Sequence, residues 1–335
     1  MHRHSIRPAA PARASVPANG RARVLAGALA LLFAGCAAPR PPQAAPGPGA
    51  AQLRAPSVPR LISTDSLAAL AARSGAAPPL VVDMRTDVGS YLRAHIPGAV
   101  YLNSETLRVG SGGVPNLVLP AASYRTLLGR LGVRADRPVV VHSSGESRNI
   151  DATYLVWILA GFGHPSVHLL DGGFAKWEAE GRATTRDYPA LDTTPLAAPS
   201  FALERATLEE IRASLGRNTL LLVDARPPDQ YRGDAGAQMR RGHIPGAVNH
   251  HWATDLAEEG GFGLVFKGVD ELRASYAAQG ITPDRDIVVY CNGGLESSHV
   301  YFALRALLGY PKVRVYDGSW TEWAARPELP LARGS

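Results

Sequence analysis

The stretch Ile287-Val-Val-Tyr-Cys291-Asn-Gly-Gly-Leu-Glu-Ser-Ser-His299 organises the expected fold of this chain. Its β-branched start predicts a buried strand, and the two glycines after Cys291 allow the backbone to turn sharply. Apolar residues then recur at helical spacing, at Val300, Ala303, Leu304, Leu307 and Leu308. The pattern predicts a strand, a tight loop and a helix, with the cysteine at the start of the loop.

This placement gives the Cys291 thiol a candidate chemical role. Backbone N–H groups at the start of a helix favour an anion, so we expect this thiol to ionise more readily than a free one. One interpretation is a nucleophilic thiolate that carries a transferred group. The alternative is a buried structural cysteine at the end of a core strand, since free cysteine often behaves as a small apolar residue.

Four patterns occur twice, in the same order and with almost the same separations, which indicates a tandem duplication. The pairs are 80–85 with 221–226 (both Asp-x-Arg at their ends), 95–100 with 243–248 (both His-Ile-Pro-Gly-Ala-Val), 139–142 with 288–290, and 171–177 with 317–323.

Each copy alternates short β-branched strands with helical stretches, which predicts an α/β fold with a parallel sheet covered by helices on both faces. In the second copy we expect strands at 220–223, 287–290 and 313–316 and a helix at 269–279. The segment Thr207-Leu-Glu-Glu210 has the pattern of a capping box. We place the first domain at residues 61–182, a polar linker at 183–200 and the second domain at 201–331.

The basic charge of the chain is confined to its N-terminal segment. Eight of the 35 Lys and Arg residues lie in the first 60 positions, which hold no acidic residue, so the remaining 27 face 29 Asp and Glu. A nucleic-acid-binding domain carries its basic charge on the folded part. The composition therefore does not support nucleic-acid binding.

Residues 1–35 are predicted to be an export signal. A basic start is followed by about eleven apolar residues, which are too few to span a bilayer. The segment Phe33-Ala-Gly-Cys36 resembles the bacterial lipoprotein signal, in which the cysteine is lipidated. Cleavage at a nearby small residue and an uncleaved anchor are the alternatives. Residues 36–60, rich in Pro, Ala and Gly, are predicted to be a flexible tether.

The lipoprotein resemblance implies an exported protein on the periplasmic side, bound to a membrane through a lipid on Cys36. Ala37 after that cysteine favours the outer membrane by the same resemblance. The only other cysteine is Cys291, and an oxidising compartment works against unpaired thiols kept for no reason.

Taken together, the repeated motifs resemble the rhodanese family in its two-domain sulfurtransferase form, of the thiosulfate or 3-mercaptopyruvate type. The resemblance spans roughly residues 61–330 and includes the cysteine loop and Asp317-Gly-Ser-Trp320 with Trp323. In tandem members the C-terminal copy carries the cysteine. Here Ser143 aligns with Cys291, so the resemblance implies an inactive first domain that forms one wall of the cleft.

The resemblance implies that Cys291 takes sulfur from a small donor, holds it as a persulfide and passes it to cyanide or a thiol. It implies no cofactor. The residues expected to bind substrate are Asn292, Gly293, Gly294, Leu295, Glu296, Ser297, Arg226 and Trp320.

The loop departs from the patterns that would identify the donor. Thiosulfate-using members resemble Cys-Arg-Lys-Gly and mercaptopyruvate-using members resemble Cys-Gly-Ser-Gly-Val-Thr, whereas Asn292, Gly293 and Gly294 follow the cysteine here. Another family cation falls on Gln230. A charged Glu296 would raise the pKa of the thiol or repel an anionic donor. We expect Glu296 to point to solvent, and the donor stays open.

Several of these residues also have structural interpretations. Asp224 with Arg226 fits a buried pair that fixes the end of a strand, and Trp320 fits the core. The adjacent His250 and His251 would point in opposite directions on a strand and have no third ligand at zinc spacing, so no metal site is predicted. The functional prediction is a sulfurtransferase; the alternative is a non-catalytic binding or sulfur-carrier module.

Overall fold

The computed structural model describes residues 57–73, 77–144, 148–198, 200–260 and 264–334. The expected signal segment, Cys36 and nearly all of the expected tether lie outside these residues. Within the described ranges, no helix is long and apolar enough to cross a membrane.

In the described part of the first copy, five strands form one sheet in which all neighbours are parallel. In sheet order they are β1 (Arg60–Ile62), β7 (Val167–Leu170), β6 (Val139–His142), β2 (Leu80–Asp83) and β3 (Ala99–Tyr101). Alternate residues of β2 and β6 enter two different apolar clusters, because successive side chains of a strand point to opposite faces. Both faces of this sheet are therefore buried.

Helices cover both of those faces. One face packs against α1 (Thr64–Ala71), α2 (Val88–Arg93) and α5 (Gly173–Ala179), and the other against α3 (Ala121–Arg130) and α4 (Ile150–Gly161). This is the arrangement expected of near-continuous apolar strands, which must be covered on both sides.

The second copy repeats the plan with four described strands, again parallel throughout. In sheet order they are β13 (Val313–Val315), β12 (Ile287–Tyr290), β8 (Leu221–Asp224) and β9 (Val248–Asn249). The helices on one face are α6 (Leu208–Ser214), α7 (Pro228–Arg232) and α10 (Ser319–Ala324), and those on the other are α8 (Val269–Ala278) and α9 (Leu295–Phe302). The predicted α/β fold with tandem copies is confirmed.

Local predictions agree with the structure to within a residue or two. The capping box is formed: the Thr207 hydroxyl accepts from the Glu210 N–H, and the Glu210 carboxylate accepts from the Thr207 N–H. The strand, loop and helix around Cys291 are also confirmed. Helix α9 ends at Phe302, and the rest of the predicted helix continues as the π-helical turn Ala303–Leu307.

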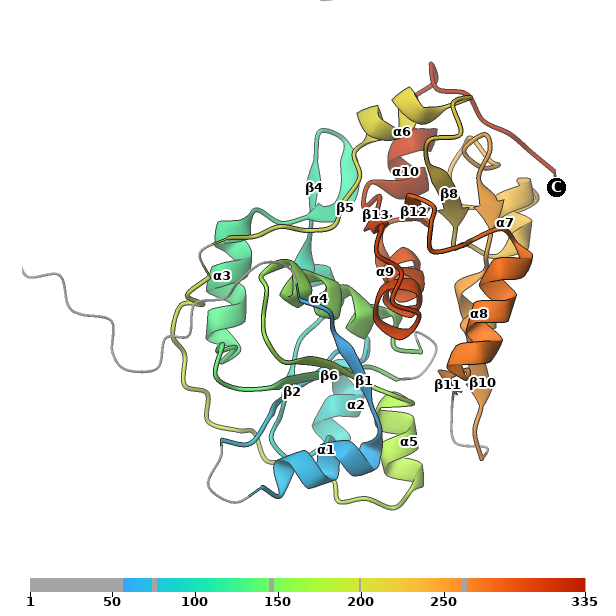
Figure 1. The fold of residues 1–335 in the computed structure, drawn as a ribbon. Helices are drawn as coiled ribbons and strands as arrows, with labels where there is room; N and C mark the ends of the chain where they lie inside the picture. The colour runs from blue at the N-terminus through green and yellow to red at the C-terminus, as the bar shows by residue number, and fades with distance from the viewer. Residues whose placement is uncertain (1–56, 74–76, 145–147, 199, 261–263, 335) are drawn as a thin grey trace, which may run out of the picture. The chain divides into compact units, whose positions relative to one another are not determined.

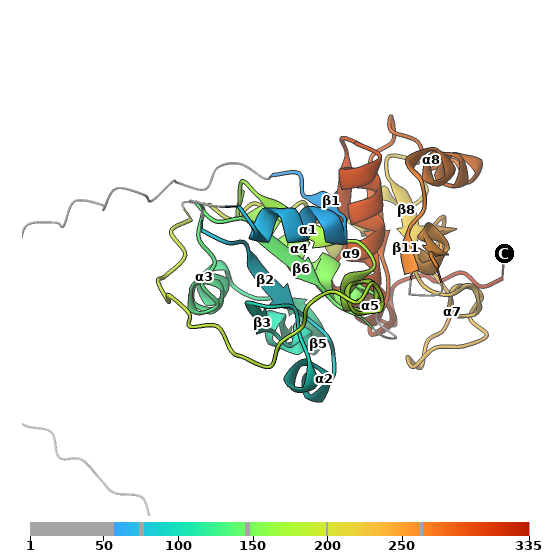
Figure 2. The same ribbon diagram turned by 90° about the horizontal axis from the view of Figure 1, so that it is seen from below.

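The two copies meet along α4 and α9, which lie side by side (Figure 1 and Figure 2). The hydroxyls of Thr153 on α4 and Ser298 on α9 are 2.9 Å apart and hydrogen-bonded. Residues of both helices belong to a single apolar cluster that also includes strands of both sheets. The copies therefore share a core.

Two hairpins add reciprocal contacts between the copies. The hairpin of the first copy is β4 (Arg108–Ser111) with β5 (Val114–Val118), and that of the second is β10 (Leu256–Glu258) with β11 (Leu264–Phe266). The Val118 N–H donates to Asp317 of the second copy at 3.1 Å, and the Phe266 N–H donates to Asp171 of the first at 3.0 Å. Asp171 and Asp317 are equivalent in the repeat, so each hairpin docks on the other copy.

A buried polar cluster lies behind α9. The carboxylate of Asp255 is 2.8 Å from Nε2 of His250 and accepts a 2.7 Å hydrogen bond from Tyr276, and Nε2 of His299 lies 3.6 Å from it. His250 thus has a carboxylate partner inside the core. In the described ranges, no group of three His, Cys, Asp or Glu side chains is arranged to hold a metal.

Because of this cluster, we expect the free energy of unfolding to fall in acid. Burial acts to raise the pKa of Asp255, but the neighbouring His250 and His299 lower it to about 2. A carboxylate with a depressed pKa contributes stability above its unfolded value near 4, and that stability is lost as the pH falls toward 2. We expect Asp255→Asn to lower the free energy of unfolding at pH 7 by about 2 kcal/mol and to flatten its loss between pH 4 and 2.

The free energy of unfolding of the wild type and of Asp255→Asn, measured by urea unfolding at pH 7, 4 and 3, checks this expectation. The control is Asp270→Asn, which removes an exposed carboxylate of α8. Equal losses for Asp255→Asn and the control at pH 7 would contradict the role given to the cluster.

Candidate active site

Hydrogen bonds to the start of α10 fix the loop between β12 and α9. The Cys291 N–H donates to the Ser319 hydroxyl at 3.1 Å, and the Trp320 N–H donates to the Cys291 carbonyl at 2.9 Å. Gly294 has φ +98°, a conformation that side chains rarely adopt, and a Cβ there would lie 3.1 Å from the ring of Tyr154. Glycine therefore permits both the turn and the close approach of the first copy.

Cys291 is one of the residues that line a cavity of about 380 Å³. It is only 1% exposed, and the Gly294 N–H donates to its Sγ at 3.1 Å. Four of the residues expected to bind substrate line the same cavity, namely Asn292, Gly293, Leu295 and Glu296. The structure therefore brings the predicted loop residues together around the thiol.

The expectation that this thiol ionises more readily than a free one is wrong. Burial, and after it the charge of Glu296, raises the pKa of Cys291 to about 11. Hydrogen bonds from the Ser297 hydroxyl and from the backbone of Ser297 and Gly293 act in the opposite direction. The loop therefore provides donors for a sulfur anion, but desolvation and the charge of Glu296 outweigh them.

The expectation that Glu296 points to solvent is also wrong. The side chain is half-buried, lines the cavity and interacts with the Cys291 thiol. Burial raises the pKa of the Glu296 carboxyl, although its contact with Cys291 acts to lower it. A carboxyl group and a thiol thus share the cavity: the charge of Glu296 disfavours ionisation of Cys291, whereas the hydrogen bond from Cys291 favours ionisation of Glu296.

Polar side chains brace the loop next to the thiol. Nδ2 of Asn292 donates to the Gln230 side chain at 2.9 Å, and the Thr321 hydroxyl donates to the Asn292 carbonyl at 2.7 Å. Gln230 therefore positions the loop through a neutral hydrogen bond, at the place where the family resemblance led us to look for a cation. Ser297 is buried, and its hydroxyl oxygen lies 3.0 Å from the Gly294 carbonyl oxygen, so its single proton can be donated either to that carbonyl or to the sulfur.

Arg226 and Trp320 lie behind the loop in the core. Nε of Arg226 donates to Asp224 at 2.9 Å, another of its nitrogens donates to the Gly242 carbonyl at 2.8 Å, and its guanidinium is 4.7 Å from the ring centroid of Trp320. Neither residue is among the described residues that line the cavity. The geometry favours the structural interpretation of both residues.

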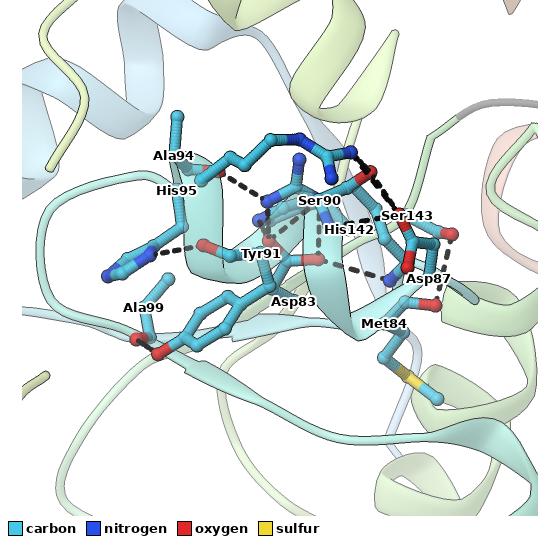
Figure 3. Close-up of polar contacts among 12 residues, drawn as sticks. Asp83, Met84, Asp87, Ser90, Tyr91, Ala94, His95, Ala99, His142 and Ser143 are labelled. Atoms are coloured by element: carbon cyan, nitrogen blue, oxygen red, sulfur yellow. Dashed lines mark hydrogen bonds and ion pairs between the residues drawn. The ribbon is translucent and has the colours of Figure 1, made fainter. Parts of the chain in front are cut away.

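The equivalent loop of the first copy presents Ser143 in place of the thiol (Figure 3). Its hydroxyl donates to the Met84 carbonyl at 3.2 Å, and its N–H donates to the Asn149 side chain. The preceding His142 is buried, with Nε2 3.9 Å from Asp83, and burial lowers the pKa of its ring. The Ser143 hydroxyl is thus engaged by backbone, which is consistent with a supporting role for this copy.

The first copy contributes one wall of the Cys291 cavity. Arg108 and Asn116 of its hairpin and Ile150 at the start of α4 all line the cavity. A Cβ on Gly293 would lie 3.2 Å from the Asn116 side chain, so the glycine at this position allows the hairpin to approach. Sequence reasoning missed these residues, because no local pattern marks a hairpin of one copy as the cover of the other copy's loop.

Residues 66–180 and 207–326 each match the family described as Rhodanese-like domain. The chain therefore belongs to the rhodanese family, as a tandem member and a transferase of the rhodanese type.

Curated relatives cover most of the described chain. A protein named "Putative thiosulfate sulfurtransferase" from Synechococcus elongatus is 34% identical over 259 residues, which is 76% of this chain and 80% of the relative. The "Sulfur carrier protein TtuD" of Thermus thermophilus is 37% identical over 267 residues, which is 76% of this chain and 90% of the relative. A "Thiosulfate sulfurtransferase" from Pseudomonas aeruginosa is 32% identical over 266 residues, with 78% and 94% covered.

Solved structures agree on the fold. YnjE superposes with a TM-score of 0.70 at 24% identity, covering 82% of this chain and 68% of that protein. An anaerobic ergothioneine biosynthesis enzyme from Chlorobium limicola superposes with a TM-score of 0.69 at 23% identity, covering 82% and 70%. At these identities the likeness concerns the fold alone.

Proposed function

We propose that the protein transfers a sulfane sulfur from a small anionic donor, of the thiosulfate or 3-mercaptopyruvate class, to a thiophilic acceptor through a persulfide on Cys291. The observation that carries this proposal is the position of Cys291, which lines a cavity of about 380 Å³ and has its sulfur 3.1 Å from the Gly294 amide nitrogen. The names of the curated relatives support the same class of reaction.

The chemistry has two balanced steps. The Cys291 thiolate attacks the outer sulfur of thiosulfate, a new S–S bond forms, and the electron pair of the old S–S bond leaves with sulfite. Cyanide or a thiolate then attacks the terminal sulfur of the persulfide. The Cys291–sulfur bond breaks, the acceptor leaves with the sulfur, and the thiolate is regenerated.

The loop fits both anionic states of this cycle. The reactive thiolate form holds negative charge on Sγ and the persulfide form holds it one atom further out, in each case near the N-terminus of α9. The N–H of Gly294 points to Sγ, and donors from Gly293 and Ser297 also favour the anion. Because these donors are fixed by the fold, they need no reorganisation when the charge moves.

A non-catalytic binding or sulfur-carrier module is the rival function. The raised pKa of Cys291 favours it, because the thiolate is scarce at neutral pH, and so does the relative named as a sulfur carrier protein. A carrier would accept sulfur but would not turn over with small donors and acceptors.

Turnover separates the two functions. We would incubate the purified protein with thiosulfate or 3-mercaptopyruvate and with cyanide, and measure thiocyanate over many enzyme equivalents. Multiple turnovers that depend on the protein support the transferase. Release of no more than one thiocyanate for each chain would favour the carrier, and absence of any sulfur loading would favour a binding module.

We also propose that the chain is exported and anchored on the periplasmic side through a lipid on Cys36. The basic start, the apolar run and the small residues before Cys36 support this proposal. Expression of the full chain with radiolabelled palmitate would show a labelled band for the wild type and none for Cys36→Ala. A label that persists in Cys36→Ala, or is absent from the wild type, would contradict it.

A further inference from the structure

We propose that Arg108, a residue of the first copy, binds the anionic sulfur donor above Cys291 and makes a dianion such as thiosulfate the preferred substrate. This inference rests on the proposed function of the cavity and specifies its donor. It assigns the first copy a direct part in substrate recognition, although that copy has no thiol of its own.

Arg108 reaches the cavity from the first residue of β4. It lines the same cavity as Cys291, and one of its terminal nitrogens is 3.5 Å from the Gly293 carbonyl oxygen. Its side chain is 8% exposed. Among the described residues that line the cavity it is the only lysine or arginine, while Glu296 brings a carboxylate.

The guanidinium keeps a hydrogen-bond donor without a partner. Nε of Arg108 is buried and, among the described residues, finds no acceptor. A buried donor of a charged group that lacks a partner is costly, and such sites are usually completed by water or a ligand. The oxygen atoms of a sulfonate-type group are acceptors of the required kind.

The ion pair between Arg108 and Glu105 still allows Arg108 to bind an anionic donor. The Glu105 side chain is 66% exposed, so solvent screens this pair and its contribution is small. The pair involves a terminal nitrogen of the guanidinium, whereas the unpartnered atom is Nε. Planar guanidinium groups offer several donors in a fixed fork, which suits an oxyanion better than a point charge does.

The hairpin fixes Arg108 at this place. The Val118 N–H of β5 donates to Asp317 of the second copy, and the side chain of Asn116 lies against Gly293. The cation is thus held by the same contacts that close the cavity. Docking of the two copies therefore determines its distance from the thiol loop.

Charge explains why a dianion gains most from Arg108. Thiosulfate carries two negative charges into a cavity that already holds Glu296 and a reacting thiolate. A guanidinium offsets this repulsion, and its effect is larger for a dianion than for the single carboxylate of 3-mercaptopyruvate. The donor whose turnover depends most on Arg108 should therefore be thiosulfate.

The test compares Arg108→Met, Arg108→Lys and the control Arg314→Met. Arg314 is also partly buried and paired with carboxylates, but it lies on β13 away from the cavity. We expect Arg108→Met to lower kcat/KM for thiosulfate about 10- to 100-fold, mainly through KM, with a smaller loss for 3-mercaptopyruvate. Arg108→Lys should recover part of the loss. Arg314→Met should leave the ratio of kcat/KM for the two donors unchanged.

A binding measurement decides the matter even if no donor is turned over. In the Cys291→Ser background, which cannot react, calorimetry would give the Kd of thiosulfate with and without Arg108→Met. A rise in Kd of about tenfold or more supports the inference whether or not the wild type shows turnover. An unchanged Kd, or equal losses of kcat/KM for the two donors, overturns it while leaving the transferase function intact.

Discussion

Replacing Cys291 with serine is expected to reduce sulfur transfer to the uncatalysed background, a loss of at least ~10³-fold in kcat. A serine hydroxyl fits the same space, but it stays protonated at neutral pH and cannot hold a persulfide. The cavity, the donors of the loop and Arg108 would all remain, so the loss would report the thiol itself. Thiocyanate formation from thiosulfate and cyanide measures this effect.

The matched control for this prediction is Ser143→Ala in the first copy. The Ser143 hydroxyl donates to a backbone carbonyl and occupies the position equivalent to the thiol. We expect Ser143→Ala to retain nearly all activity. Similar losses for the two variants would mean that the first copy takes part in the chemistry, which would contradict the assignment of Cys291 as the sole sulfur carrier.

Replacing Glu296 with glutamine is expected to increase the rate of persulfide formation at pH 7 about tenfold, because a lower thiol pKa gives more thiolate. After burial, the charge of Glu296 is the next cause of the pKa of about 11 at Cys291. The thiolate is the reactive form, so activity should rise with pH, and the variant should reach a given rate at lower pH. Removal of the charge also weakens the repulsion of an anionic donor.

The rate of Cys291 alkylation by iodoacetamide, measured from pH 6 to 11, reports the thiol pKa without any sulfur donor. Glu271→Gln is the control, since Glu271 is exposed on α8 and pairs with Lys267 away from the cavity. The alkylation curve of Glu296→Gln should shift to lower pH, and that of the control should not move. A curve that is unchanged or shifted upward in Glu296→Gln would refute the electrostatic role of this carboxylate.

Local sequence patterns predicted the parts of this structure that depend on neighbours along the chain. The β-branched run before Cys291 forms β12, the two glycines form the turn, and α9 follows at Leu295. The repeated motifs revealed two copies because each motif recurs at the same step of the same fold. The capping box at Thr207 forms because its two partners are only three residues apart.

Properties that depend on contacts between the copies could not be predicted in this way. Arg108 and Asn116 reach the thiol loop only because the hairpin of one copy docks on the other. The direction of the pKa shift at Cys291 depends on how deeply the cavity is buried and on where Glu296 points, and neither is encoded in the spacing of nearby residues. Burial therefore reversed an expectation that rested on the helix N-terminus alone.

The mass of the intact protein after incubation with thiosulfate tests the central claim most directly. We predict that the wild type gains the mass of one sulfur atom, located on the peptide that contains Cys291, and that added cyanide removes it. Cys291→Ser should gain nothing. A protein whose Cys291 is labelled by iodoacetamide, yet gains no sulfur from thiosulfate or 3-mercaptopyruvate, would contradict the account.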